Sequence, residues 1–263
     1  WIAVATGQHH SLGLRANGSL WAWGSNGSGE LGFGGGLGGN YPSPVRVGTG
    51  TNWKAISAGP SHNLAIQSDG SLWAWGTDQY GQLGQGNTGT GNTRTSPTRV
   101  GTANDWAAVS AGYAFSVAVK TDGSLWAWGI NNGYQLGLGD TTTRTTPTRV
   151  GTGMDWESVS ASRNFCVGLK ADRSLWTWGN SDALGQGSGT TTSTSPGRIG
   201  AGSDWVAIAA GTSHAVALKA DGITWGWGFT GWDRNVFGYG STGSIFPDPV
   251  KISETARSRV SAN

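Results

Sequence analysis

Trp73-Ala74-Trp75-Gly76 is one of five copies of a tetrapeptide that decides the fold of this chain. The copies recur at an interval of roughly fifty residues, and self-similarity at such an interval is the signature of a repeat architecture. A further tryptophan precedes each copy at the same interval, and only Trp232 of the sixteen tryptophans lies outside these positions. The tetrapeptides are 21–24, 73–76, 126–129, 176–179 and 225–228, and the preceding tryptophans are Trp1, Trp53, Trp106, Trp156 and Trp205.

Each repeat reads as four short strands. In the second repeat, residues 53–58 alternate in polarity and predict a first strand, and the large-small-large triplet 64–66 predicts a second strand that is packed on both faces. Asp69-Gly70 is a two-residue hairpin signal, and 71–75 form the third strand. Residues 97–100 predict a short fourth strand, which should lie at the outer edge because it starts with proline.

Four antiparallel strands per repeat, with no helical period, predict an all-β protein, a β-propeller of four-stranded antiparallel blades. Blades stack face to face, so the tetrapeptide indoles are interpreted as packing between blades. These structural tryptophans are Trp21, Trp23, Trp73, Trp75, Trp126, Trp128, Trp176, Trp178, Trp225 and Trp227.

Composition narrows the class of partner. Only 12% of the 263 residues are charged and the net charge is +2, which argues against a nucleic-acid or anionic-membrane surface. No apolar run is long enough for membrane insertion. The single cysteine, Cys166, excludes an internal disulfide. Few lysines and many Ser, Thr, Asn and Gly residues favour an extracellular or cell-surface location in a bacterium, and a start at Trp1 suggests a processed product or an excerpt.

The repeat resembles a known family. The motifs Gly-x-x-His, Asp-Gly-Ser-Leu-Trp-x-Trp-Gly, Gly-Gln-Leu-Gly-x-Gly and Pro-x-x-Val are similar to the regulator-of-chromosome-condensation repeat, in a version like that of bacterial members. The resemblance covers essentially the whole chain. It implies a propeller, typically of seven blades, in which the first strand of each repeat lies nearest the axis.

Five repeats are visible within one propeller domain, 1–252, and residues 253–263 are expected to be the first strand of a truncated further repeat. The ring either closes with five blades or is part of a seven-blade ring that further repeats or another copy would complete. The expected repeat bounds are 1–52, 53–105, 106–155, 156–204 and 205–252.

No catalytic constellation is apparent. His10, His62 and His214 occupy the same repeat position, but Phe115 and Phe165 replace them in the other repeats. A catalytic or metal-binding side chain would not be exchanged for phenylalanine around a ring, so we interpret these histidines as hydrogen-bonding groups that stabilise a turn. We therefore expect no enzyme activity, no catalytic residue, no metal and no cofactor.

The loops that follow the first and third strands emerge on one side of the blades, and there the repeats diverge. The fifth long loop contains the only tryptophan outside the pattern, beside an acidic and a basic residue. This loop either contacts a partner or forms a cap over an end blade. Candidate binding residues on this face are Tyr80, Tyr113, Tyr134, Arg163, Trp232, Asp233 and Arg234.

A non-enzymatic binding scaffold for a protein or glycan is the function that these features favour. The main alternative is a structural repeat module in a large bacterial surface protein. Nucleotide exchange on a small GTPase, known in the family, is disfavoured because the chain has no basic tail. Ultraviolet-B sensing is disfavoured because the family's photoreceptor places tryptophan directly after the glycine of Gly-x-x-His, where this chain has Gln8, Pro60, Tyr113, Arg163 and Thr212.

Overall fold

The computed structural model of the chain describes residues 1–229 and 245–252, which form five four-stranded antiparallel sheets, here called blades 1 to 5. Blade 1 consists of β1 (Ala3–Thr6), β2 (His10–Leu14), β3 (Leu20–Ser25) and β4 (Asn40–Arg46). Blade 2 consists of β5 (Trp53–Ala58), β6 (His62–Gln67), β7 (Leu72–Gly76) and β8 (Arg94–Arg99), with a 3-10 turn, η1 (Thr90–Asn92), before β8. Blade 3 consists of β9 (Trp106–Ala111), β10 (Phe115–Lys120), β11 (Ser124–Gly129) and β12 (Arg144–Met154). Blade 4 consists of β13 (Trp156–Ala161), β14 (Phe165–Lys170), β15 (Leu175–Asn180) and β16 (Thr192–Ile199). Blade 5 consists of β17 (Trp205–Ala210), β18 (His214–Lys219), β19 (Thr224–Phe229) and β20 (Ile245–Lys251).

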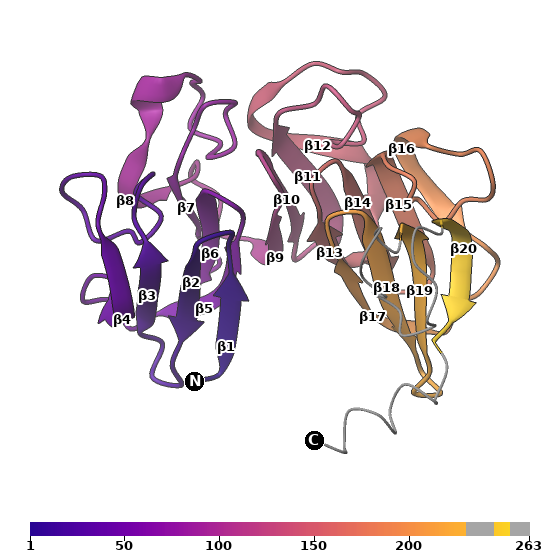
Figure 1. The fold of residues 1–263 in the computed structure, drawn as a ribbon, viewed down its shortest axis with the longest axis horizontal. Coiled ribbons are helices and arrows are strands. Elements are labelled where there is room, and N and C mark those ends of the chain that lie inside the picture. Colours follow the sequence, from indigo (N-terminus) through magenta and orange to yellow (C-terminus); the bar gives the residue numbers. More distant parts are fainter. Residues whose placement is uncertain (230–244, 253–263) are drawn as a thin grey trace.

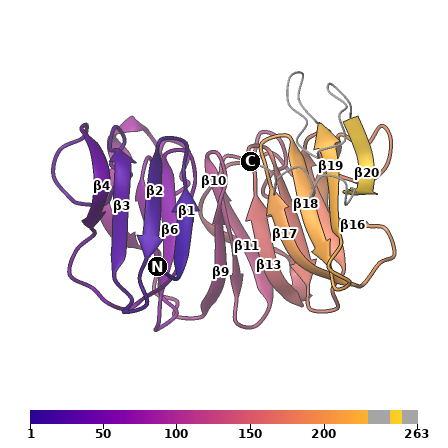
Figure 2. The ribbon, with the colours of Figure 1, turned by 60° about the horizontal axis from the view of Figure 1, so that its bottom comes forward.

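The blades are arranged as an arc around a common axis, which confirms the predicted all-β propeller architecture (Figure 1). The first strands β1, β5, β9, β13 and β17 line the inner side of the arc, and the fourth strands lie at its outer side (Figures 1 and 2). The fourth strand of every sheet is an edge strand, as its prolines predict. In blade 2 it runs over Arg94–Arg99, so it begins before Pro97 and not at it.

Neighbouring inner strands are joined by hydrogen bonds from backbone to serine. The Ser57 hydroxyl accepts from the Ala111 amide at 3.0 Å, and the hydroxyls of the two equivalent serines accept from Ala161 and Ala210 at 2.9 and 3.0 Å. An inner strand has backbone donors on the side that faces the axis, and these contacts satisfy one of them at three of the four interfaces between the described blades. The serine side chains therefore help to hold the inner row of strands at a fixed spacing.

The hairpin turns contain a hydrogen-bonded chain that explains the Asp-Gly-Ser-Leu-Trp motif. The Asp69 carboxylate accepts from the backbone amide of Ser71 at 2.9 Å and from its hydroxyl at 2.6 Å, and the hydroxyl accepts from Trp73 Nε1 at 2.9 Å. The same geometry recurs in the turns of blades 3 and 4. At Arg173, where other repeats have glycine, φ is 62°, so this residue adopts a left-handed backbone conformation.

Each blade has two unlike faces because neighbouring residues of a strand point to opposite sides of the sheet. In blade 2, Leu64 and Ile66 lie on an aliphatic face, whereas Ala65 pairs with Trp73 on a tryptophan face. The central residue of the triplet is small because indoles cover it. A Cβ on Gly168 would lie 2.5 Å from Cζ3 of Trp156.

The aliphatic face of each blade packs on the tryptophan face of the next blade. Leu12, Leu14 and Leu20 of blade 1 form one buried cluster with Trp53 and Trp75 of blade 2. Three further clusters repeat this contact between blades 2 and 3, 3 and 4, and 4 and 5. The second indole of the tetrapeptide is fully buried in blades 2 to 5, at Trp75, Trp128, Trp178 and Trp227.

Each of these four indoles also donates a hydrogen bond to a loop carbonyl of the preceding blade. Trp75 Nε1 donates to the Glu30 oxygen at 2.8 Å and Trp128 Nε1 to the Gln82 oxygen at 2.9 Å. Trp178 and Trp227 make the equivalent bonds to Gln135 and Ala183 at 3.0 and 2.9 Å. A buried indole N–H needs such a partner, so the bond fixes the loop of one blade relative to the sheet of the next.

A second donor supports the same loop carbonyls. Asn63 Nδ2 donates to the Glu30 oxygen at 2.8 Å and Ser116 Oγ to the Gln82 oxygen at 2.8 Å. In blade 4 the corresponding donor is the buried Cys166 thiol, whose sulfur lies 3.6 Å from the Gln135 oxygen. Burial raises the pKa of this thiol, and its place in the interface gives the lone cysteine a packing role.

At each end of the arc, one face of the end blade has no neighbouring blade among the described residues. On the tryptophan face of blade 1, Trp1 is 56% exposed and Trp23 is only partly buried, whereas Trp75 is fully buried. On the aliphatic face of blade 5, Val216 and Leu218 are partly buried, although the equivalent residues of blades 1 to 4 are buried. Within the described residues, blade 5 does not cover blade 1 as other blades cover their neighbours. The described blades therefore form an open arc and not a closed five-blade ring.

Replacing Trp128 by alanine tests this packing. Removal of a fully buried indole should destabilise the chain by about 3–5 kcal/mol, because it leaves a cavity and removes one of the two hydrogen bonds to the Gln82 carbonyl. Trp23→Ala, at the same repeat position on the uncovered face of blade 1, should cost about 1 kcal/mol or less. Urea unfolding followed by far-ultraviolet circular dichroism measures both. Equal losses for the two variants would contradict the packing described above.

Candidate binding face

The connections between first and second strands and those between third and fourth strands lie at the same end of every blade, here called the loop-bearing end. The short connections are residues 7–9, 59–61, 112–114, 162–164 and 211–213, and the described long connections are 26–39, 77–93, 130–143 and 181–191. The antiparallel order of the strands places both kinds of loop together. This is the arrangement that the sequence predicted for the divergent loops.

The short connections surround a depression of about 440 Å³ on the axis of the arc. Three residues from each blade line it, among them Gly7, Gly59 and Gly112. Glycine permits the close approach of blades 1 and 2 here, because a Cβ on Gly7 would lie 2.5 Å from the Gly59 carbonyl oxygen. In blade 4 the residue is Ser162, whose hydroxyl donates to the Gly211 carbonyl at 2.5 Å and joins blades 4 and 5.

Tyr113 and Arg163 meet at the rim of this depression. They come from the short connections of blades 3 and 4, and the Arg163 guanidinium carbon lies 5.3 Å from the centre of the Tyr113 ring. The Tyr113 side chain is 51% exposed, and its backbone amide donates to the Ser162 carbonyl at 3.1 Å. A backbone hydrogen bond between blades 3 and 4 therefore supports the two connections that carry the cation–π pair.

Two further depressions adjoin the pair. One of about 410 Å³ is lined by Tyr113 and Arg163 together with polar residues that include Asn132, Gln135 and Asn180. The other, of about 300 Å³, is lined by Arg163, Asn164 and Asn180 and by Asp182 at blade 4. Arg163 is common to all three depressions. We call their continuous lining the Arg163 groove.

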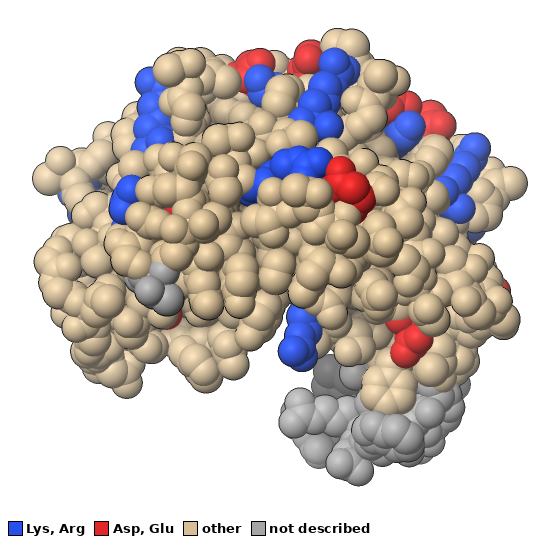
Figure 3. Space-filling view, turned by 90° about the horizontal axis from the view of Figure 1, so that it is seen from above, with Lys and Arg blue, Asp and Glu red and all other residues tan. Residues whose placement is uncertain are grey.

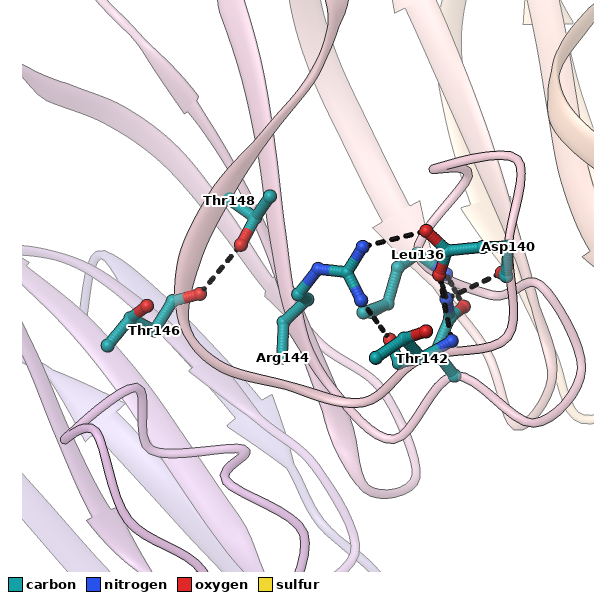
Figure 4. A network of polar contacts seen from close by, with 7 residues as sticks. Leu136, Asp140, Thr142, Arg144, Thr146 and Thr148 are labelled. Carbon is teal, nitrogen blue, oxygen red and sulfur yellow. Dashed lines mark hydrogen bonds and ion pairs between the residues drawn. The ribbon is translucent and has the colours of Figure 1, made fainter.

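The long loop of blade 3 is held in shape by a polar network (Figure 4). Arg144 donates to the Asp140 carboxylate and to the Thr142 carbonyl, each at 2.7 Å. The Asn131 amide donates to the Asp140 carbonyl at 2.7 Å and accepts from the Leu136 amide at 3.0 Å. The hydrogen bond from Arg144 is the main reason why the pKa of Asp140 is lowered. The outer wall of the groove is thus ordered by contacts within the loop.

A family model described as the RCC1-like domain matches residues 1–262. The chain belongs to the RCC1-like domain family. It is 30% identical over 137 residues to the ultraviolet-B receptor UVR8 of Arabidopsis thaliana, a match that covers 52% of this chain and 31% of the receptor. It is 34% identical over 140 residues to the probable E3 ubiquitin-protein ligase HERC6 of Homo sapiens, which covers 52% of this chain and 14% of the ligase. The matches thus span less than a third of either relative.

Two solved structures share the fold of this RCC1-like domain. Human WBSCR16 superimposes with a TM-score of 0.84 at 23% identity, over 95% of this chain and 66% of that protein. Prp20p from Saccharomyces cerevisiae superimposes with a TM-score of 0.61 at 20% identity, over 97% of this chain and 77% of that protein. At these identities the likeness concerns the fold alone.

The candidate binding residues do not all gather in one place in this RCC1-like domain. Tyr113 and Arg163 meet in the groove, whereas Tyr80 and Tyr134 lie in the long loops of blades 2 and 3 and do not line the three depressions. Tyr134 has φ of 57° at a turn position where blades 1 and 2 have glycine. Trp232, Asp233 and Arg234 lie outside the described residues.

Asn164 and Asn180 are groove residues that sequence reasoning did not select. Both line the two outer depressions, and the Asn180 backbone N–H donates to the Asn164 backbone carbonyl at 2.9 Å. A signal was present, because Asn164 follows Arg163 in the divergent short connection and Asn180 directly follows the tetrapeptide glycine of blade 4. Asparagine is common in ordinary loops, so its presence did not distinguish these two positions.

The ring hydrogen bonds of His10 and His62 run to the next blade, and their second ring nitrogens have no hydrogen-bond partner among the described residues, so the expected bonding within their own turns is wrong for these two. His10 Nε2 lies 2.7 Å from the Asn63 side-chain oxygen, and His62 Nε2 lies 3.1 Å from the Ser116 hydroxyl. Burial lowers the pKa of His10, His62 and His214, that of His62 to about 3, so the neutral form of each ring is favoured in the fold. Phe115 is fully buried at the equivalent position, which shows that this site accepts an apolar ring as well.

Charge is dispersed over the surface. Figure 3 shows Lys and Arg side chains in separate groups, with Asp and Glu between them, over a mostly uncharged surface. Lys120, Lys170 and Lys219 form ion pairs with Asp105, Asp155 and Asp204. Among the described residues, no three His, Cys, Asp or Glu side chains are grouped so that they could hold a metal ion. The same part of the chain has no helix with the length and apolar character needed to span a membrane.

Asp78 is a buried carboxylic acid beneath the long loop of blade 2. Its Oδ1 accepts from the Leu83 amide at 2.9 Å, as Asn26 and Asn131 accept from Leu31 and Leu136, but its buried Oδ2 has no partner among the described residues. Burial raises the pKa of Asp78 to about 6. Burial therefore favours the neutral carboxylic acid in the folded chain. The free energy of unfolding decreases as pH rises from about 4 to 6, because the carboxyl ionises more readily in the unfolded chain than in the fold.

Asp78→Asn should stabilise the chain by about 1–3 kcal/mol at pH 8 and change little at pH 3.5, because the amide removes a buried charge without altering the shape. Urea unfolding at several pH values measures the difference. Glu157→Gln, which removes an exposed carboxylate, is the matched control and should alter stability by less than about 0.5 kcal/mol throughout. A pH-independent difference between Asp78→Asn and the parent chain would refute the assignment.

Proposed function

We propose that this RCC1-like domain is a non-enzymatic scaffold that binds a protein partner through the loop-bearing end, with the Tyr113–Arg163 pair at the centre of the contact. The observation that carries the proposal is the exposed aromatic-cation pair where three depressions meet. Tyrosine and arginine are enriched among the residues that dominate binding energies. A glycan is the alternative ligand for the same face.

The rest of the structure supports a division between scaffold and contact. The tryptophans of blades 2 to 5 are engaged in packing between blades, while the residues of the short connections differ from blade to blade. A rigid framework that presents variable loops is a common design of binding proteins. Yeast Prp20p, which shares the fold, is described as binding Gsp1p and histones, and a further structure contains Kap60 bound to it.

Other functions of relatives fit this chain less well. Ultraviolet-B sensing is the activity named for UVR8. The second residue of each short connection, where the family's photoreceptor places tryptophan, is not tryptophan in this chain. Ligase activity is named for HERC6, of which the match covers only 14%. An extracellular or bacterial cell-surface location remains a proposal from composition. The relatives reported above are plant, human and yeast proteins and lend it no support.

Site-directed cross-linking tests the proposed face. Thr212→Cys places a thiol at the loop-bearing end of blade 5, and Ala220→Cys places one in the hairpin turn at the opposite end. The native Cys166 is fully buried, so a benzophenone maleimide should label only the introduced thiol. In an extract of the source organism, we expect discrete protein adducts from position 212 and not from position 220. Adducts from both positions alike, or from neither, would contradict a protein-binding role for this end.

Assembly is a second candidate role, favoured by the uncovered tryptophan face of blade 1 and the partly uncovered aliphatic face of blade 5. We propose that a second copy packs its blade 5 on this blade 1, because four interfaces within the chain already show that the two faces fit. Such a head-to-tail contact is heterologous and can continue from copy to copy.

Sedimentation velocity over a range of concentrations tests the assembly. We expect reversible association of the parent chain and a monomer at every concentration for Trp23→Glu, which places a charge on the open face. Met154→Glu changes an equally apolar residue that is 58% exposed elsewhere, and should associate like the parent. A parent chain that stays monomeric at high concentration would exclude assembly between copies.

A further inference from the structure

Arg163 differs from the other described cations of the loop-bearing end. Arg94 donates to the Asn92 carbonyl at 3.2 Å, and Arg144 is bound by Asp140 and Thr142. Among the described residues, the Arg163 guanidinium has no hydrogen bond or ion pair, and it lies over the Tyr113 ring. An arginine has five N–H donors, so those of Arg163 are available to a ligand.

The Tyr113 ring restricts where that ligand can bind. A guanidinium over an aromatic ring keeps the edges of its plane free, and those edges carry the N–H groups that bind a carboxylate in a bidentate manner. Because the ring lies at 5.3 Å, it orients the side chain before any ligand arrives and reduces the entropy lost on binding. The pair is therefore suited to receive a planar anion.

The groove on either side of Arg163 is suited to a peptide backbone. Toward the outer edge, Asn164 and Asn180 are exposed side chains that line both outer depressions. The Asn164 side-chain amide offers two donors and an acceptor, and that of Asn180, which also donates to Thr192 Oγ1 at 3.3 Å, offers one further donor and an acceptor. These groups match the alternating N–H and C=O groups of an extended chain. Toward the axis, the depression of about 440 Å³ is large enough for a side chain of the bound segment.

We propose that the Arg163 groove binds an extended segment of a partner protein whose carboxylate pairs with the Arg163 guanidinium. The inference rests on the proposed function and names the chemistry of the contact. The carboxylate comes from an Asp or Glu side chain or from the C-terminus of the partner. Asp182 lies exposed in the outermost depression, so the part of the segment that reaches it carries no acidic group.

A polyanion does not fit the same residues. Nucleic acids are bound by clusters of Lys and Arg that follow the phosphate backbone. Here a single free guanidinium is followed along the groove by amides and then by the carboxylate of Asp182, which would repel a row of phosphates. One carboxylate with a neutral or basic continuation is the charge pattern that matches this surface.

Selection of peptides against the folded full-length chain tests the inference. A displayed library of random short peptides is used in two formats, one with a free C-terminus and one with both ends embedded. We expect enriched peptides to share one acidic position or, in the first format alone, a terminal carboxylate. Fluorescence anisotropy of an enriched synthetic peptide should show affinity at least about tenfold weaker for Arg163→Gln, equivalent to about 1.4 kcal/mol.

Matched variants identify the contact. Arg163→Lys should retain part of the affinity for the peptide. Lys54→Gln removes an exposed cation at the end of blade 2 opposite the loop-bearing end, and should retain the full affinity. Changing the acidic residue of the peptide to its amide should weaken its affinity for the parent chain by the same factor as Arg163→Gln does. The same change should weaken its affinity for the Arg163→Gln variant little further, because the two groups interact directly.

If peptides are enriched, two results would overturn the inference and leave the proposed function in place. One is a set of enriched peptides without a shared carboxylate. The other is a carboxylate whose loss costs as much against Arg163→Gln as against the parent. Failure to enrich any peptide also overturns it, while cross-linking from position 212 tests separately whether a folded protein binds this end.

Discussion

The contact between the indole of one blade and the aliphatic face of the blade before it is the interaction on which the structure depends. It combines the burial of a large apolar surface with a hydrogen bond from the indole to a loop carbonyl, so it fixes both the distance and the rotation between two sheets. Four such contacts, at Trp75, Trp128, Trp178 and Trp227, build the arc. Their repetition explains why single repeats tolerate exchanges elsewhere, such as phenylalanine for histidine at position 115.

The same contact separates structure from recognition. Because the indole holds the base of the long loop in the preceding blade, the outer parts of the loops are free to vary without loss of the fold. Tyr113 and Arg163 lie in short connections that Ser162 joins to their neighbours. Its carbonyl accepts from the Tyr113 amide of blade 3, and its hydroxyl donates to the Gly211 carbonyl of blade 5. A side chain on such a support loses less entropy when it binds a partner, which suits it to recognition.

The repeat made much of this fold predictable. Tryptophans at a constant interval, Asp-Gly turns and triplets with a small central residue each follow from a local requirement that appears five times in the sequence. The left-handed conformation of Arg173 was foreseeable for the same reason, because glycine stands at that turn in the other repeats. The start of the fourth strand was less predictable, since Arg94 precedes the proline and pairs with Gly76 only in the folded sheet.

The candidate site was predictable only in part, because its residues come from different blades. Sequence comparison between repeats selected Tyr113 and Arg163 but could not show that they touch, nor that Tyr80 and Tyr134 lie away from them. The buried acid at Asp78 was missed because a polar loop gives no sign of burial in the sequence. Such features depend on how neighbouring blades approach each other, and that geometry is set by the indoles.

Hydrogen exchange at the indole nitrogens, followed by NMR, tests this account most directly. The account predicts that the Nε1 protons of Trp75, Trp128, Trp178 and Trp227 exchange only through unfolding of the array, while that of Trp23 on the uncovered face exchanges rapidly. Equally rapid exchange at all five indoles would contradict the central role of this contact.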